Sequence, residues 1–223
     1  MGYLPEDFMS ITDYLISRDP SLILENEPSD SNYKCFNTGG VETAVGEFLY
    51  GWVRLIRPEN ILETGTHLGI SSSYMAQALK DNGRGLLTTI EIERQHIQTS
   101  TARWEKLGLS KYILCDKEFS IEYDLEYDTD LMFLDSEPEF RFKELLRFFP
   151  RLKSGGYVFI HDLHRHMHQI PNEEHDFAWP YGKIPAAFTA LVTSGQLRPF
   201  HFSTPRGLTG FYKVSEGDYK WQQ

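Results

Sequence analysis

Five acidic residues of the sequence stand at the ends of short apolar segments, where their side chains could contact a ligand. They are Glu63, Glu91, Asp116, Asp135 and Asp162. A carboxylate accepts hydrogen bonds from hydroxyl and amino groups and attracts cations. If these segments are strands of one sheet, this chemistry suits a cationic or hydroxyl-rich ligand, or a metal ion.

A glycine-rich segment, ETGTHLGIS (residues 63–71), follows the first of these apolar segments. Gly65 and Gly69 let the backbone approach a ligand closely, and Ser71 with its neighbours opens a helix whose N–H groups favour an anion. The spacing is G-x-x-x-G rather than G-x-G-x-x-G, so the central glycine that admits a pyrophosphate is missing. The Gly-Lys-Ser/Thr of a phosphate-binding P-loop is missing as well.

The next two apolar segments each end in a carboxylate. Glu91 closes LLTTIE about 20 residues after the glycine turn, where an acidic side chain can accept hydrogen bonds from both ribose hydroxyls. Asp116 closes KYILCD and could accept a hydrogen bond from an adenine amino group. The pattern therefore favours a nucleoside that carries a carboxylate, such as S-adenosylmethionine.

The segments that must position these residues alternate between strand and helix from about residue 42 onward. We expect strands at 60–65, 86–93, 111–116, 129–136, 155–162, 198–204 and 207–214. We expect helices at about 42–57, 70–82, 94–107, 138–153 and 184–196. Such alternation predicts a doubly wound, mostly parallel α/β sheet covered on both faces. The last two strands are too close in sequence for a crossover, so they should pair antiparallel.

In the first of these helices, apolar residues recur at the spacing of one helical face. The face comprises Val45, Phe48, Leu49, Trp52, Leu55 and Ile56. Residues 1–40 differ from the rest, with three prolines and many turn formers. We interpret them as an N-terminal extension with a short helix at about 6–17, packed on a domain formed by residues 41–223.

Composition excludes several classes of protein. The chain has 223 residues and a net charge of −10, which argues against a non-specific duplex-DNA binder. Its 2 cysteines, Cys35 and Cys115, exclude a disulfide scaffold and a cysteine-based zinc cluster. No segment reads as a membrane span or a secretory signal, so we expect a cytoplasmic protein.

The glycine segment, the TIE strand end and the segment DLMFLDSEPEFRFKELLRFFPRLKSGGYVFIHD (residues 130–162) carry a family resemblance. Over about residues 37–214 the sequence resembles class I S-adenosylmethionine-dependent methyltransferases, and it is most similar to the catechol O-methyltransferase-like group. The resemblance implies a Rossmann-like, seven-stranded sheet with a C-terminal antiparallel pair. It implies cofactor contacts at Val41, Glu63, Gly65, Thr66, Gly69, Ser71, Glu91, Asp116, Lys117 and Asp135.

The resemblance also raises the question of a metal. In this family the aspartate matching Asp135 faces the methyl-transfer centre and often binds a divalent ion. His161 and Asp162 stand where metal-dependent members carry Asp-Asn or Asp-Asp. A histidine ligand leaves Mg²⁺, Mn²⁺, Fe²⁺ and Zn²⁺ all open. The lysine that often follows the fourth strand is missing, so the base is sought among His161, His164, Glu137 and a metal-activated substrate oxygen.

The sequence thus predicts an S-adenosylmethionine-dependent O-methyltransferase with Asp135, His161 and His164 as catalytic residues. The acceptor would be a hydroxyl of a natural product, sugar or catechol-like small molecule, with or without a divalent metal. No nucleic-acid or membrane partner is expected. The oligomeric state stays open, with a homodimer as one option because relatives of this kind often pair through N-terminal helices. Two alternatives stay open, namely a nicotinamide-dependent oxidoreductase and a non-catalytic cofactor-binding relative.

Overall fold

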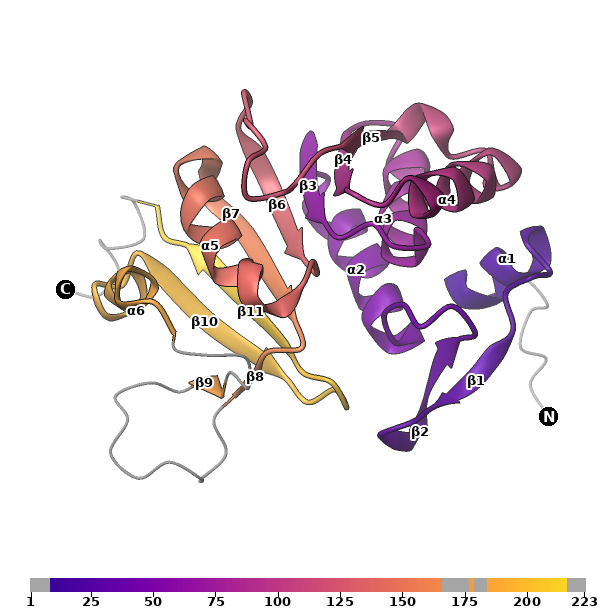
Figure 1. Cartoon of the computed structure of the whole chain (residues 1–223), viewed down its shortest axis with the longest axis horizontal. Helices are drawn as coiled ribbons and strands as arrows, with labels where there is room; N and C mark the ends of the chain where they lie inside the picture. The colour runs from indigo at the N-terminus through magenta and orange to yellow at the C-terminus, as the bar shows by residue number, and fades with distance from the viewer. Residues whose placement is uncertain (1–8, 166–176, 179–183, 216–223) are drawn as a thin grey trace, which may run out of the picture.

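The central feature of the computed structural model is one seven-stranded sheet of order β10-β11-β7-β6-β3-β4-β5 (Figure 1). Its strands are β3 (Asn60–Thr64), β4 (Leu86–Glu91), β5 (Ile113–Lys117), β6 (Thr129–Leu134), β7 (Leu152–His161), β10 (Leu197–Phe202) and β11 (Leu208–Lys213). The five strands from β7 to β5 run parallel, whereas β11 pairs antiparallel with both β7 and β10. This confirms the predicted fold class. The structure describes residues 9–165, 177–178 and 184–215.

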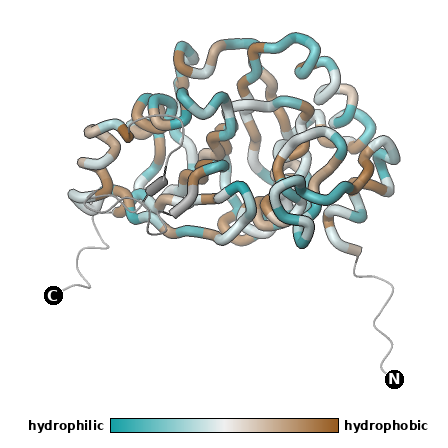
Figure 2. Tube along the Cα trace, turned by 60° about the horizontal axis from the view of Figure 1, so that its bottom comes forward, coloured by the Kyte–Doolittle hydropathy of each residue, from teal (hydrophilic) through white to brown (hydrophobic). Residues whose placement is uncertain are grey.

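Helices cover both faces of the sheet. One face packs against α1 (Ile11–Arg18), α2 (Thr43–Ile56), α3 (Ile70–Asn82) and α4 (Arg94–Leu107), and the other against α5 (Pro138–Phe148) and α6 (Ala186–Thr193). Alternate residues of a strand serve the two cores: in β6, Phe133 packs on the side of α2 and α3, and Leu134 packs on the side of α5. Figure 2 shows hydrophobic segments inside the fold and hydrophilic ones around it.

The N-terminal segment lies outside the main sheet. After α1, strands β1 (Leu24–Glu27) and β2 (Asp30–Phe36) form a separate hairpin at the end of the molecule opposite α6 (Figure 1). Buried Asp19 joins this segment to α4, since its Oδ2 accepts from Arg103 Nε at 3.1 Å. A further short pair, β8 (His164–Arg165) and β9 (Phe177–Ala178), follows β7. Among the described residues, none of the helices could cross a membrane.

Two local predictions were wrong. In α2, Val53 rather than Leu55 faces the core: Val53 is 0% exposed and Leu55 73%. The predicted helix 138–153 ends at Phe148, and a short 3₁₀ turn (Phe149–Arg151) leads into β7. Pro150 explains this end, because its ring would clash with the carbonyl four residues earlier and it has no N–H to donate.

Candidate active site

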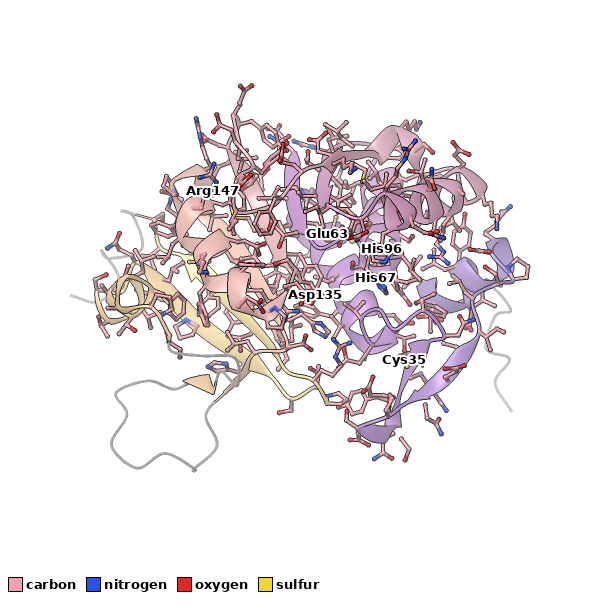
Figure 3. All side chains as sticks on the ribbon, viewed as in Figure 1. Cys35, Glu63, His67, His96, Asp135 and Arg147 are labelled. Atoms are coloured by element: carbon pink, nitrogen blue, oxygen red, sulfur yellow. The ribbon has the colours of Figure 1, made fainter. Side chains whose placement is uncertain are left out.

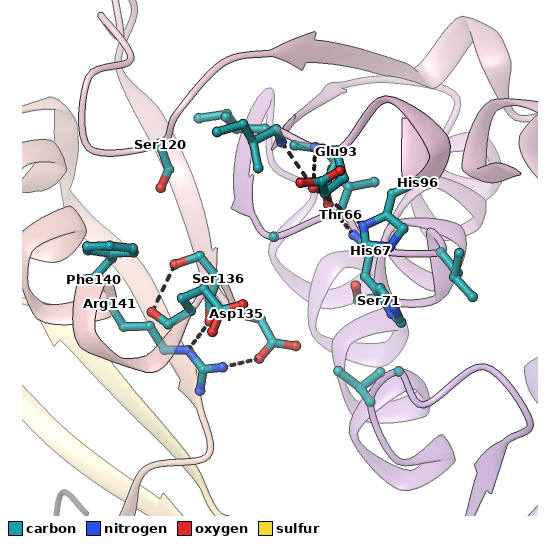
Figure 4. Close-up of a pocket in the computed structure, with 18 of the residues that line it drawn as sticks. Thr66, His67, Ser71, Glu93, His96, Ser120, Asp135, Ser136, Phe140 and Arg141 are labelled. Carbon is teal, nitrogen blue, oxygen red and sulfur yellow. Dashed lines mark hydrogen bonds and ion pairs between the residues drawn. The ribbon is translucent and has the colours of Figure 1, made fainter. Parts of the chain in front are cut away.

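A cavity of about 500 Å³ opens at the carboxyl ends of the parallel strands. Its walls come from the glycine segment after β3, the segment after β4, the loop after β5 and the start of α5, with Gly39–Val41 at one end (Figure 4). In α/β sheets, ligands bind at this edge, and the volume is that of a small-molecule site. In Figure 3, Glu63, His67, His96 and Asp135 lie together near the centre, whereas Cys35 and Arg147 lie away from them.

Gly65 allows two loops to meet at the floor of the cavity. Its φ is +81°, and a Cβ added there would lie 2.4 Å from the carbonyl oxygen of Asp135. No other residue could hold this backbone without displacing the β6 loop. Gly69 also has a positive φ of +74°, but it faces Ser100 and α4 and does not line the cavity.

Glu63 lies behind the cavity rather than in it. Its side chain is fully buried and accepts hydrogen bonds from Ser71 Oγ (2.5 Å to Oε1) and Ser72 Oγ. Burial raises the pKa of Glu63 to about 7, although the serine hydroxyls oppose the rise. The N-cap of α3 is Gly69, so no side chain caps this helix, and Ser71 in its first turn lines the cavity.

Glu91 is held in place by backbone donors. It accepts from the N–H groups of His67 at 2.7 Å, Ile92 at 3.0 Å and Glu93 at 2.9 Å. His67 and His96 stand beside it edge to face, with ring centroids 4.6 Å apart. Burial, followed by the neighbouring His96, lowers the pKa of His67. The carboxylate of Glu91 is thus fixed at the cavity wall, with a pair of imidazoles next to it.

The residues predicted for an adenine edge lie beside the cavity. Asp116 accepts from the hydroxyl of Tyr123 at 2.7 Å, and neither Asp116 nor Lys117 lines the cavity. The next three residues, 118–120, do line it, and Phe119 packs edge to face on Phe140 with centroids 5.1 Å apart. At the end of this strand, the cavity wall therefore begins at residue 118, two residues after the predicted Asp116.

The fold brings Asp135, His161 and Asp162 together, with one potential ligand atom of each lying within 4.8 Å of the others. His161 is fully buried, and both of its ring nitrogens are engaged. Nε2 lies 2.7 Å from Oε2 of Glu42, and Nδ1 lies 3.1 Å from Oδ1 of Asp135. Burial opposes the charged form, but Asp135, Glu42 and Asp162 raise the pKa of His161 to about 9.

Two arginines that the sequence analysis missed complete this cluster. Arg141 Nη2 lies 3.0 Å from Oδ1 of Asp135, and its Nη1 lies 2.9 Å from Oδ2 of Asp162. Its Nε donates to the carbonyl of Ser136 at 2.8 Å. Arg206 contacts Asp162 from the other side, with Nε 2.9 Å from Oδ1 and Nη2 3.2 Å from Oδ2. Asp162 has a φ of +57°, so its two ion pairs hold a backbone conformation that few non-glycine residues adopt.

A second buried carboxylate, Glu144 of α5, ties together the loops that form the cavity. It accepts from Thr64 Oγ1 at 2.8 Å, Ser136 Oγ at 2.6 Å and Ser120 Oγ. Thr64 is the last residue of β3, whereas Ser136 and Ser120 lie in the loops after β6 and β5. Burial raises the pKa of Glu144, against the effect of the three hydroxyls. Glu144 lies three residues after Arg141, so the two charged side chains share the buried face of α5. This helical spacing was the only sequence feature that indicated a role for Glu144.

The predicted site residues differ in whether they line the cavity. Val41, Gly65, Thr66, Ser71, Glu91, Asp135 and Asp162 line the cavity. His161 lies behind it, fully buried, and the side chain of His164 falls outside the described residues. The hydroxyl of Ser136 donates to Glu144, and the N-cap of α5 is Glu137, which makes no side-chain cap hydrogen bond.

Comparison with known proteins gives this geometry a context. The family model of the methyltransferase domain matches residues 62–163, which contain the glycine segment, Glu91 and the strand ends at Asp135 and Asp162. Over this part, the chain is similar to methyltransferase domains. A relative named "Putative O-methyltransferase" from Mycolicibacterium smegmatis is 25% identical over 150 residues, which are 66% of this chain and 69% of the relative. One from Mycobacterium ulcerans is 27% identical over 127 residues, 55% of this chain and 56% of its own.

Solved methyltransferase structures share the fold. The S-adenosylhomocysteine-bound methyltransferase of Podospora anserina has a TM-score of 0.62 at 13% identity, covering 96% of this chain and 100% of its own. The O-methyltransferase TomG of Streptomyces achromogenes, solved with S-adenosylmethionine, has a TM-score of 0.59 at 16% identity, covering 96% and 100%. The aligned regions span between 56% and 69% of the two curated relatives' lengths.

Proposed function

We propose that this methyltransferase transfers the methyl group of S-adenosylmethionine to a hydroxyl of a small molecule in the cavity described above. The observation that carries the proposal is the open N-terminus of α3 facing Glu91 across one cavity. Backbone N–H groups at a helix start favour a carboxylate, and a fixed glutamate favours ribose hydroxyls. The relatives named as O-methyltransferases and the neighbours solved with S-adenosylmethionine or S-adenosylhomocysteine support this choice.

The donor's parts are assigned as follows. Its methionine carboxylate would meet the backbone N–H groups at the start of α3 and near Val41, and its ribose would donate to Glu91. The adenine would lie against residues 118–120, which we now prefer to Asp116 and Lys117 because those two do not line the cavity. Its sulfonium would lie nearest Asp135, whose negative charge suits a cation.

S-adenosylmethionine supplies an activated methyl group, which passes in line to the acceptor oxygen as the carbon–sulfur bond breaks and sulfur keeps the electron pair. The protein must hold the two reactants and receive the hydroxyl proton. We assign the proton to Oδ2 of Asp135, since Oδ1 already contacts His161 and Arg141. Among the described residues none donates to Oδ2.

The residues expected to hold a divalent metal do not fit one as they stand. Both nitrogens of His161 contact carboxylates, and Arg141 bridges Asp135 and Asp162. No step of the proposed reaction is therefore assigned to a metal. A metal-assisted variant would require the ion to displace Arg141. Homodimer formation and a cytoplasmic location stay predictions of the sequence.

The test is methyl transfer from isotope-labelled donor to a panel of catechols, sugars and hydroxylated natural products. We expect label in at least one hydroxylated acceptor and none in its methoxy counterpart. Glu91→Ala should lose most of the transfer at limiting donor, while Glu105→Ala, an exposed glutamate on α4, serves as the matched control. Label that appears equally in the methoxy counterpart would refute O-methylation.

A further inference from the structure

The guanidinium of Arg141 lies between the two carboxylates that end β6 and β7. It contacts Asp135 at 3.0 Å and Asp162 at 2.9 Å, and its side chain is 5% exposed. Its other contacts are the carbonyl oxygens of Ser136 and His161. All three nitrogens of this guanidinium thus contact the same strand ends, so the group is held in one orientation. Figure 4 shows it reaching from α5 to Asp135 at the cavity wall.

Two arginines already bring positive charge to this cluster. Arg141 makes ion pairs with Asp135 and Asp162, and Arg206 makes one with Asp162. The side chains of Asp135 and Asp162 are only 16% and 15% exposed, so water screens these ion pairs little. A divalent cation would have to enter beside these guanidinium groups, and like charges that are largely removed from water repel each other strongly.

We propose that Arg141 is a built-in cation that replaces a divalent metal at this methyl-transfer site, and that the site binds no metal ion. Arg141 acts as a positioning residue: it fixes Oδ1 of Asp135 and leaves Oδ2 toward the cavity. Arg206 secures Asp162 from the opposite side, with its Nε 2.9 Å from Oδ1. Both oxygens of Asp162, both ring nitrogens of His161 and Oδ1 of Asp135 are in this way already engaged by protein groups.

This arrangement narrows the acceptor class, a step that rests on the proposed function. A divalent ion can coordinate two neighbouring hydroxyl oxygens of a substrate, such as those of a catechol, and lowers the pKa of a coordinated hydroxyl. A guanidinium whose three nitrogens already contact the protein does not chelate two substrate oxygens in this way. The acceptor therefore needs only a single hydroxyl, placed against Oδ2 of Asp135, and an isolated phenol or alcohol should serve as well as a vicinal diol.

Cation binding is tested on the whole purified chain by the electron paramagnetic resonance of free Mn²⁺, with neither donor nor acceptor present. We expect no saturable loss of the free-ion signal from the wild type at millimolar Mn²⁺. Arg141→Gln removes one positive charge and should bind one Mn²⁺ at least about ten-fold more tightly than the wild type. Arg147→Gln is the matched control, because Arg147 lies on the same helix but donates to the carbonyls of Tyr123 and Glu122.

Two results would overturn the proposal. One is stoichiometric Mn²⁺ binding by the wild type that is lost in Asp162→Asn. The other is a folded Arg141→Gln variant with no gain in Mn²⁺ affinity. If Arg141→Gln does not fold, the wild-type measurement decides. Arg141→Lys keeps the positive charge and should bind no Mn²⁺ either. Binding of S-adenosylhomocysteine, measured separately by calorimetry, reports on the proposed function whatever the metal result.

Discussion

The ionisation of buried Glu63 should make the protein less stable as the pH rises. Its pKa is raised to about 7 in the fold, from an ordinary value of 4.5. The folded state therefore holds this proton more tightly than the unfolded chain does. Below the unfolded pKa the group costs nothing. As the pH rises from 4.5 to 7, the unfolded chain releases this proton while the fold still holds it, and the corresponding stability is lost.

The size of the effect follows from the shift. Each pKa unit corresponds to about 1.4 kcal/mol, so the penalty reaches about 3 kcal/mol once the pH exceeds the folded pKa. Between pH 5 and pH 8 the wild type should lose about 2–3 kcal/mol through this residue alone. Glu63→Gln keeps the shape and has no titration, and the hydroxyls of Ser71 and Ser72 can rotate to suit the amide.

Urea unfolding of the ligand-free protein at pH 5, 6, 7 and 8 measures the prediction. The difference in unfolding free energy between Glu63→Gln and the wild type should grow in favour of the variant across this range. Glu105→Gln, an exposed glutamate of α4, should show a constant difference. Parallel stability curves for Glu63→Gln and the wild type would refute the reasoning, because Glu63 would then titrate as it does in water.

Three other substitutions have expected outcomes. Glu91→Ala should weaken binding of S-adenosylhomocysteine by about ten-fold or more in calorimetry, since charge-assisted hydrogen bonds to ribose are lost. Gly65→Ala should cost about 2 kcal/mol or more in urea unfolding, because its φ is +81° and its Cβ would meet the Asp135 carbonyl at 2.4 Å. Glu144→Ala should cost about 2–3 kcal/mol in the same assay and also weaken cofactor binding, because three loops lose their shared acceptor. An unchanged affinity of Glu91→Ala, or an unchanged urea transition of Gly65→Ala or Glu144→Ala, would contradict the corresponding prediction.

Sequence pattern was sufficient for the architecture. Hydrophobic periodicity and glycine stops located the strands and helices of the sheet, because each depends on residues only a few positions apart. The prediction that Leu55 faces the core was wrong for a related reason. Its spacing fits an apolar helix face, but the sheet and the neighbouring helices pack against Val53 instead. The end of α5 was missed although Pro150 carried the signal.

The candidate site was predictable only in part. Glu91 and Asp135 end strands, which is a local property, and both line the cavity. From the sequence alone, Arg141 is one of several cations on a charged helix, and Arg206 lies in a predicted turn. Their roles come from pairing with Asp162, which lies 21 residues from Arg141 and 44 from Arg206. Such pairs are set by tertiary packing, which a single sequence does not encode in spacing.

The most direct test of the central claim is calorimetry of S-adenosylhomocysteine with the wild type and Glu91→Ala, in buffer containing a chelator. The account predicts saturable binding of one molecule per chain to the wild type, unchanged by the chelator and at least about ten-fold weaker in the variant. Absence of binding at millimolar ligand, or binding that Glu91→Ala does not weaken, would contradict the claim that this cavity holds the methyl donor.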